Sequence, residues 1–232
     1  MATKHTTPMR LRIQRALMRS LVRFIYHAIA NVEITGWENI PEQGPYMVTF
    51  NHVSIYDPPL VLSFWPVSSE AIAAEYLWEE KWISLVVRGY GSIPVSRDFF
   101  DRSLINKTLG ILAGGGILTL SPEGERSFKP GLIPAKPGIA YLAEKAGVPI
   151  VPVGVTGTTG DLIQRARRLE RPEVSMRIGK PFKLPEGTSK GADRKENRKQ
   201  NADTVMYKIA ELLPEEYRGV YADVPEKVTG EE

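Results

Sequence analysis

The sequence predicts an α/β protein, with a mostly parallel central sheet flanked by helices and an amphipathic helix at the N-terminus. Short apolar runs alternate with helically spaced segments along most of the 232 residues, as in a parallel sheet whose strands are connected by helices. The run Ile117-Leu118-Thr119-Leu120 is continuously apolar apart from one threonine, which is typical of a strand buried on both faces. A chain of this length fits one large domain better than two small ones.

The N-terminal segment has the pattern of a cationic amphipathic helix. Residues 1–8 are expected to be a disordered lead-in, and helical spacing begins at Met9 and continues to Ala30. Four arginines recur three or four positions apart and therefore share one helix face. They are Arg12, Arg15, Arg19 and Arg23. Such a helix can lie in a lipid interface with its guanidinium groups extended toward anionic headgroups, or it can be an ordinary docking helix with a solvated basic face.

The remaining elements follow from the alternation of apolar and helical segments. The predicted strands are residues 32–35, 46–50, 71–74, 93–95, 116–120, 148–153 and 174–178. The predicted helices between them are residues 58–64, 76–88, 103–113 and 137–146. The polar stretch 185–203 is expected to be a loop leading into a last helix near 202–213, and the final ten residues are expected to be a tail.

Composition excludes several kinds of site. The chain has no cysteine, so disulfides, cysteine-ligated zinc and thiol catalysis are all excluded. The net charge of +3 is too small to indicate a partner by itself. The sequence has no apolar run of about 20 residues and no apolar block after a basic N-terminus, so we expect a soluble or surface-bound protein rather than an integral membrane protein.

The segment Asn51-His52-Val53-Ser54-Ile55-Tyr56-Asp57 holds the strongest catalytic candidates. His52 follows a predicted apolar strand, at the edge where parallel sheets place their ligand sites. Neither a helix nor a strand would bring His52 and Asp57 together, but a tight turn could. An aspartate that accepts a hydrogen bond from imidazole Nδ1–H leaves Nε2 basic. Alternatively, Asp57 caps the helix that begins with Pro58, and His52 satisfies a buried carbonyl.

Two further strands end close to an arginine. One is followed by Arg97, and the other runs into Ser121-Pro122-Glu123-Gly124-Glu125-Arg126-Ser127. Two arginines at the same end of a parallel sheet can clamp a phosphate, because guanidinium binds oxyanions in a bidentate manner. The alternative is that each arginine is a surface residue paired with a neighbouring carboxylate.

These segments together resemble the glycerophospholipid acyltransferase family, above all the bacterial 1-acyl-glycerol-3-phosphate acyltransferases. The family's first block is a histidine, four variable residues and an aspartate, as in His52 to Asp57. Its second block ends in an arginine, as at Arg97, and its third block has the pattern Pro-Glu-Gly-Thr-Arg-Ser, which corresponds to residues 122–127. The fourth block is an apolar strand that contains proline, as in residues 148–153. The blocks appear in the family's order.

The resemblance implies a fatty acyl transfer from a thioester, acyl-CoA or acyl-ACP, to the free hydroxyl of lysophosphatidic acid or a related lysophospholipid. It implies His52 as general base with Asp57 as its partner, direct transfer without an acyl-enzyme, and neither a metal nor a bound cofactor. The substrate-binding residues that it implies are Arg97, Glu123, Gly124, Arg126, Ser127 and Lys136. The chain departs from the pattern at Glu125, where a small residue is commoner, and at Ala135, where an aromatic residue is frequent.

We therefore divide the chain into a membrane-association helix (1–30), an acyltransferase domain (31–222) and a tail (223–232), and expect a peripheral protein on the cytoplasmic face of a membrane. Two other patterns could contact a carrier, a membrane or an acyl chain, although solvated or core positions explain them equally well. They are the basic cluster Arg165, Arg167, Arg168 and Arg171, and the stripe Trp78, Trp82, Leu85 and Val86. The alternative functions are an acyl thioesterase and a non-catalytic peripheral lipid-binding protein.

Overall fold

The structure is a computed structural model that describes residues 4–96, 102–185 and 192–223. Its strands form one seven-stranded sheet in the order β1-β7-β6-β2-β5-β3-β4. The strands are β1 (Asn31–Thr35), β2 (Tyr46–Phe50), β3 (Glu70–Ala74), β4 (Ile93–Val95), β5 (Ile117–Leu120), β6 (Ile150–Thr156) and β7 (Glu173–Ile178). Five strands run parallel, from β6 through β4, and the β1–β7 pair runs in the opposite direction because β7 pairs antiparallel with β6. The predicted fold class is thus confirmed.

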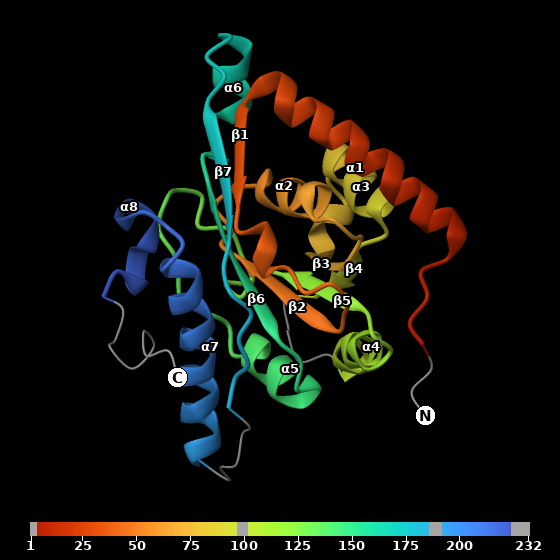
Figure 1. Ribbon diagram of the computed structural model, residues 1–232, viewed down its shortest axis with the longest axis vertical. Coiled ribbons are helices and arrows are strands. Elements are labelled where there is room, and N and C mark those ends of the chain that lie inside the picture. Colours follow the sequence, from red (N-terminus) through yellow and green to blue (C-terminus); the bar gives the residue numbers. More distant parts are fainter. Residues whose placement is uncertain (1–3, 97–101, 186–191, 224–232) are drawn as a thin grey trace.

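Helices cover both faces of the sheet (Figure 1). The α-helices are α1 (Met9–Ile29), α2 (Asp57–Phe64), α3 (Lys81–Tyr90), α4 (Arg102–Ala113), α5 (Gly138–Ala146), α6 (Leu162–Arg167), α7 (Ala192–Ala210) and α8 (Glu215–Arg218). The short 3-10 helices are η1 (Trp37–Asn39), η2 (Glu75–Trp78) and η3 (Gly219–Tyr221). One core cluster joins α1, α2 and α6 to one face of the sheet, and another joins α4, α5 and α7 to the opposite face. Alternate residues of β2 point to the two clusters, with Val48 in the first and Met47 in the second.

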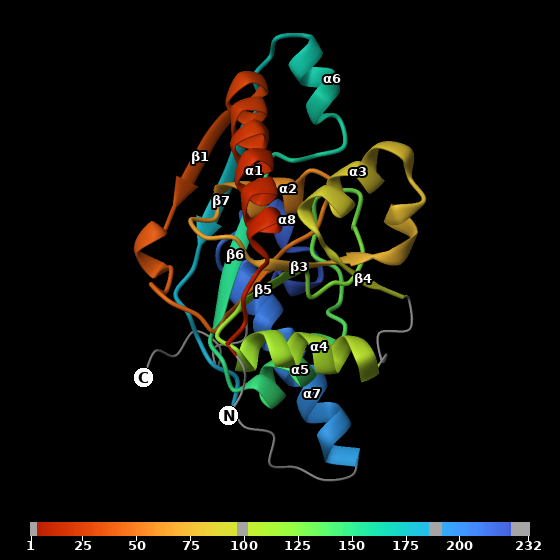
Figure 2. The same ribbon diagram turned by 90° about the vertical axis from the view of Figure 1, so that its right-hand side faces the viewer.

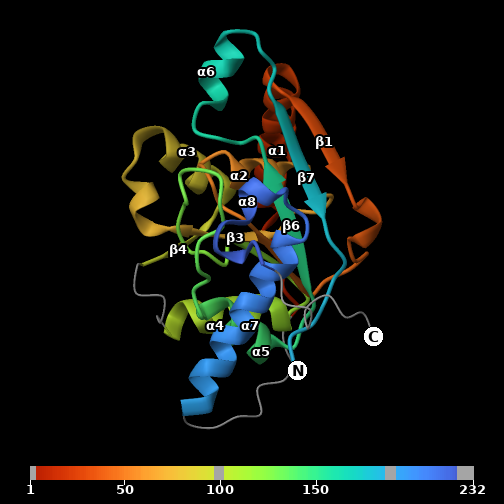
Figure 3. The same ribbon diagram turned by 90° about the vertical axis from the view of Figure 1, so that its left-hand side faces the viewer.

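Several predicted elements differ from the structure. The helix predicted over 76–88 is divided into η2 and α3, and α6 was not predicted. The stretch predicted as a polar loop, 185–203, contains the first half of α7, which begins at Ala192. That half is held to the domain by polar contacts to α5, where Glu144 accepts hydrogen bonds from Arg198 and Asn201. A helix that docks through polar side chains lacks the apolar periodicity that would have revealed it. Figure 3 shows α7 and α8 on the side of the molecule opposite α1.

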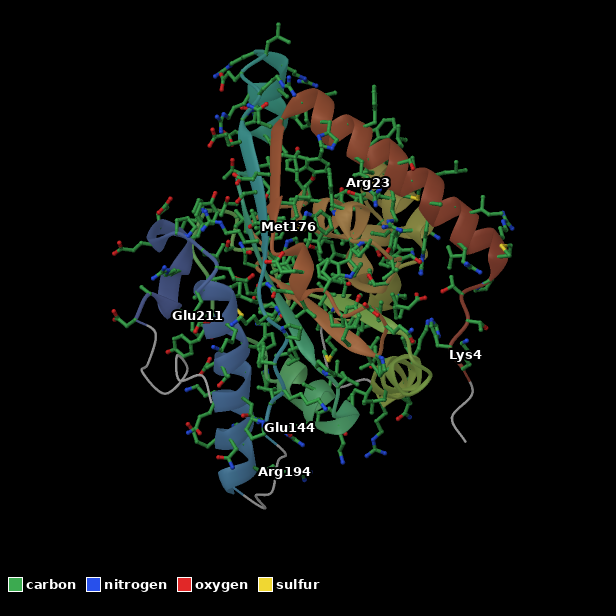
Figure 4. The ribbon with its side chains drawn as sticks, viewed as in Figure 1. Lys4, Arg23, Glu144, Met176, Arg194 and Glu211 are labelled. Atoms are coloured by element: carbon green, nitrogen blue, oxygen red, sulfur yellow. The ribbon has the colours of Figure 1, made fainter. Side chains whose placement is uncertain are left out.

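The N-terminal helix turns Arg15, Arg19 and Arg23 inward, contrary to the predicted lipid-facing or solvated basic face, and leaves Arg12 exposed. Arg15 is fully buried and forms a bidentate ion pair with Glu70. Arg19 and Arg23 donate to the carbonyls of Trp65 and Ser63 at the carboxyl end of α2, whose last carbonyls have no partner within their own helix. Arg23 accordingly lies on the side of α1 that faces α2 (Figure 4).

The opposite face of α1 is apolar and exposed. Leu17 is 68% exposed and Phe24 is 71% exposed, and Met9, Ile13 and Leu21 are exposed beside them. Helix α3 lies next to α1 (Figure 2), and its Trp82 is 82% exposed. The aromatic stripe of α3 therefore includes surface positions rather than being part of the core. Within the described ranges, no helix is both long enough and apolar enough to cross a membrane.

The lead-in predicted to be disordered makes contacts in its described part, residues 4–8. The backbone N–H of His5 donates to the carbonyl of Gly114, and its imidazole lies 3.1 Å from Glu70. The Thr7 hydroxyl donates to the same carboxylate. Glu70 thus ties both the lead-in and α1 to the start of β3.

Candidate active site

The candidate site begins where β2 ends. Asn51 follows β2, and its side-chain amide exchanges two hydrogen bonds with the backbone of Val155 in β6, at 2.7 and 2.8 Å. Because β2 and β6 are parallel neighbours, their carboxyl ends meet at the same edge of the sheet. The pairing fixes the direction in which the chain leaves β2, and the next residue is His52.

A turn brings the imidazole of His52 to the carboxylate of Asp57. The turn is closed by the backbone N–H of Asp57, which donates to the carbonyl of Ser54. The distance from His52 Nδ1 to Asp57 Oδ2 is 3.0 Å, and Oδ2 also accepts the backbone N–H of Ser54 at 2.7 Å. An ionised carboxylate only accepts hydrogen bonds, so the Nδ1 atom carries the proton and Nε2 is the basic nitrogen.

The two partners differ in their access to solvent. Asp57 is fully buried, whereas 18% of the His52 side chain is exposed. Asp57 is the first residue of α2, where the helix dipole favours a negative charge. This geometry leaves a histidine with an open nitrogen supported by a shielded anion, which is the arrangement that general base catalysis requires.

A second buried carboxylate, Glu123, supports the backbone of this histidine. Its Oε2 accepts the N–H of His52 at 2.6 Å, and its Oε1 accepts the N–H of Ile133 at 3.1 Å. The pKa of Glu123 is raised to about 7, mainly by burial and to a smaller extent by the charge of Asp57, while its hydrogen bonds oppose the rise. Glu123 is only 1% exposed and its oxygens bind backbone. Glu123 thus positions the His52 loop, and its contact with substrate stays a prediction.

The loop after β5 is joined to the histidine segment through backbone atoms. The N–H groups of Ser127 and Phe128 donate to the carbonyls of His52 and Val53, at 2.9 and 3.1 Å. Gly124 has a φ of 70°, a conformation that glycine adopts without steric cost. The Ser127 hydroxyl donates to the Lys129 carbonyl. Gly124 and Ser127 thus shape this loop.

The basic residues predicted to bind substrate lie around the same loop. Arg126 stacks over the ring of the exposed Phe128, with its Cζ 4.8 Å from the ring centroid. Lys136 forms an exposed ion pair with Glu125 at 2.9 Å. The negative charge at Glu125, a departure from the family pattern, is thus paired with Lys136 rather than with Arg126. Arg97 lies outside the described residues, so the structure does not test the predicted pair of arginines.

The basic cluster of residues 165–171 is partly paired internally. Glu170 pairs with both Arg165 and Arg168, at 3.0 and 3.7 Å. Arg171 donates to the carbonyl of His27 near the end of α1. Figure 1 shows α6 projecting beyond the sheet at the end of α1.

Thr158, two residues after β6, was not predicted from the sequence. Its hydroxyl donates to Asp57 Oδ1, and its carbonyl accepts the hydroxyl of Ser54. Tyr26 of α1 was not predicted either, and its hydroxyl donates to the carbonyl of Tyr56, next to Asp57, at 2.5 Å. The only local signal for Thr158 was a Gly-Thr-Thr-Gly turn after an apolar strand. In the part of the chain that the structure describes, no cluster of three or more His, Asp or Glu could hold a metal ion.

The chain is similar in sequence to known acyltransferases. The chain is 25% identical over 179 residues to the human 1-acyl-sn-glycerol-3-phosphate acyltransferase alpha, covering 71% of this chain and 59% of that protein. It is 23% identical over 152 residues to the 1-acyl-sn-glycerol-3-phosphate acyltransferase of Bacillus subtilis, covering 65% of this chain and 73% of that protein.

A solved structure shares the fold. The crystal structure of the 1-acyl-sn-glycerophosphate (LPA) acyltransferase PlsC from Thermotoga maritima matches with a TM-score of 0.59 at 23% identity. The match covers 82% of this chain and 78% of that one. The profile of the family described as Acyltransferase matches residues 31–156, which is more than half of the chain. The chain therefore belongs to the acyltransferase family.

Proposed function

We propose that this protein is a 1-acyl-sn-glycerol-3-phosphate acyltransferase, which forms phosphatidic acid from lysophosphatidic acid and an acyl thioester. The observation that carries the proposal is the contact between the partly exposed imidazole of His52 and the buried carboxylate of Asp57. The names of the relatives support the choice of acceptor. The donor is acyl-CoA or acyl-ACP, and no bound cofactor takes part.

In the proposed reaction, Nε2 of His52 removes the proton from the free hydroxyl of the acceptor. The oxygen attacks the thioester carbonyl, and the tetrahedral oxyanion collapses to an ester while the C–S bond breaks. The imidazolium, stabilised by Asp57, then returns its proton to the thiolate. General base catalysis of this kind typically contributes a factor of about 100 to 10,000. Ser54 is buried and its hydroxyl donates to Thr158, which favours direct transfer over an acyl-enzyme.

We assign the acceptor phosphate to Arg126, with Arg97 as the second member of the clamp and Lys136 at its margin. Arg126 follows the strand β5, which pairs with β2 on one side, so it extends from the same edge of the sheet as His52. Losing one charged contact of about 2 kcal/mol would raise the KM for a phosphate-bearing acceptor about 30-fold. Arg126→Ala should show this increase without the same change for the acyl donor, whereas the exposed Arg177→Ala should not. An effect confined to the donor would contradict the clamp.

We also propose that the protein docks peripherally on a membrane, at its cytoplasmic face, through the exposed apolar faces of α1 and α3. The supporting observations are the exposed Leu17, Leu21 and Phe24 on α1 and Trp82 on α3. The arginines of the inner face of α1 bind the domain itself, so apolar contact rather than charge supplies most of the binding. This arrangement predicts binding that high salt weakens only slightly, because salt screens only the charged contribution.

The catalytic proposal is tested with a labelled acyl thioester, with and without lysophosphatidic acid. Acceptor-dependent formation of phosphatidic acid is expected, and His52→Ala should reduce it to below a few per cent. The control His27→Ala, at an exposed histidine of α1 whose ring contacts Phe64, should keep it. Thioester loss without acceptor would favour the thioesterase. Lipid binding with no turnover in any condition would favour the non-catalytic protein.

The docking proposal is tested by co-sedimentation with phosphatidylcholine vesicles that contain phosphatidylglycerol. Phe24→Ser combined with Trp82→Ser should release most of the protein from the vesicles. Val220→Ser, which removes an exposed apolar side chain near the C-terminus, should not. Equal binding by all three proteins, or complete release by salt alone, would contradict docking through these faces.

A further inference from the structure

The carboxylate of Asp57 has two oxygens with different partners. Oδ2 accepts the imidazole N–H of His52 and the backbone N–H of Ser54. Oδ1 points away from the histidine and accepts the hydroxyl of Thr158. Since Asp57 is fully buried, Oδ1 has no solvent to replace this donor.

Both the hydroxyl and the carbonyl of Thr158 form hydrogen bonds with residues of the site. It lies two residues after the end of β6, is 1% exposed, and its carbonyl accepts the hydroxyl of Ser54 from the histidine loop. One threonine therefore joins the loop after β2 to the loop after β6 through a donor and an acceptor. The preceding Gly157 donates its N–H to the hydroxyl of Tyr217 at 3.1 Å, so α8 supports the turn from outside.

A buried carboxylate remains ionised only when hydrogen bonds replace the water that it loses. If the Thr158 hydroxyl were removed, Oδ1 would be buried without a donor and the carboxylate would hold a proton more tightly. The imidazolium of His52 would then give up its proton less readily, because the carboxylate beside it would have lost a donor that stabilises its charge. A base that must be deprotonated to act would work less well at neutral pH.

We propose that Thr158 is a positioning residue of the acyl transfer, which orients Asp57 and keeps it ionised behind His52. The proposal rests on the function proposed above. Thr158 contacts Asp57 rather than substrate, so its loss should lower kcat and leave the KM values for donor and acceptor almost unchanged.

The titratable groups around Asp57 come from several elements. They are His52 of the same loop, Glu123 after β5, Tyr26 of α1 and Tyr217 of α8. Burial raises the pKa of both tyrosines well above neutral, and it raises the pKa of Glu123 to about 7. Glu123 is present in every variant compared, so a difference between variants reports on the His52–Asp57 pair.

The test compares Thr158→Val, which keeps the shape and removes the hydroxyl, with Thr158→Ser, which keeps the hydroxyl. Thr158→Val should lower kcat about 10- to 100-fold and move the acidic limb of the kcat/KM profile to higher pH. Thr158→Ser should stay within about 3-fold of the wild type. The matched control is Thr159→Val, because the hydroxyl of Thr159 donates to Asp161 at the surface. This variant should change neither kcat nor the pH profile.

Two further measurements keep the proposal open to refutation. Thr158→Ala also removes the hydroxyl but leaves a smaller side chain. It replaces Thr158→Val in the comparison if that variant does not fold. Titration of His52 by NMR, assigned with His52→Ala, measures the pair without substrate. An unchanged titration and kcat in folded variants without the hydroxyl would overturn the assignment. If removal of the hydroxyl shifted the His52 titration although the wild type had no transferase activity, the result would support the role of Thr158 and overturn only the proposed function.

Discussion

Replacing Arg15 by methionine should destabilise the whole domain rather than weaken membrane binding. The guanidinium of Arg15 is fully buried and contacts Glu70 at 2.7 and 3.0 Å. Its Nε donates to the carbonyl of Tyr90 at 2.8 Å, and its Cζ lies 4.7 Å from the centre of the Tyr90 ring. Burial alone would raise the pKa of Glu70, but hydrogen bonds and charge from Arg15 and His5 lower it overall. Loss of Arg15 removes the largest of the effects that lower this pKa and leaves Glu70 buried without its main cationic partner.

The size of the effect follows from this uncompensated charge. Removing one partner of a buried ion pair typically costs about 3 to 5 kcal/mol. Glu70 would keep its contacts with His5 and Thr7, so we expect the lower end, about 3 kcal/mol. For a chain of this size, that corresponds to a decrease in Tm of about 10 °C. Arg15→Met combined with Glu70→Met should recover at least about 1 kcal/mol, because no charge is then left buried.

Urea unfolding followed by circular dichroism and tryptophan fluorescence measures these free energies. The matched control is Arg12→Met, one turn earlier on the same helix and exposed, which should change the free energy of unfolding by less than about 0.5 kcal/mol. If Arg15→Met were as mild as Arg12→Met, the guanidinium would not be buried. The basic face of α1 would then be solvated or lipid-facing, as the sequence pattern suggested.

Two other predictions concern residues around the candidate site, and each has a matched control. The folded protein holds the proton of Glu123 up to about pH 7, whereas the unfolded chain releases it near 4.5. The free energy of unfolding should therefore fall as pH rises between these values, by about 3 kcal/mol from this group. Urea unfolding from pH 4.5 to 8 should show that Glu123→Gln removes this decrease and that the exposed Glu125→Gln keeps it. An equal dependence of the free energy of unfolding on pH in both variants would contradict the raised pKa of Glu123. Gly157→Ala would place a Cβ 1.9 Å from the carbonyl oxygen of Glu173 at a φ of 79°, and it should lower the free energy of unfolding by at least about 2 kcal/mol. The control is Gly160→Ala, whose Cβ meets nothing within 4 Å. This variant should melt within about 2 °C of the wild type.

Local patterns in the sequence were sufficient to predict the sheet and the contact between His52 and Asp57. The apolar runs at β2 and β5 are continuous because both faces of these strands are covered, so their positions could be predicted from short segments. His52 and Asp57 are five residues apart and are joined by one turn. Their contact therefore depends on local chain geometry, which a single segment encodes.

The tertiary structure alone decided which face of α1 meets the protein. Helical periodicity separates the arginines of α1 from its leucines but does not state which side is buried. That choice depends on Glu70, 55 residues beyond Arg15, and on the carbonyls at the end of α2. In the same way, Thr158 reaches Asp57 across 101 residues because β2 and β6 are neighbours in the sheet. Such contacts connect segments that carry no joint pattern in the sequence, so they appear only when the strand order brings them together.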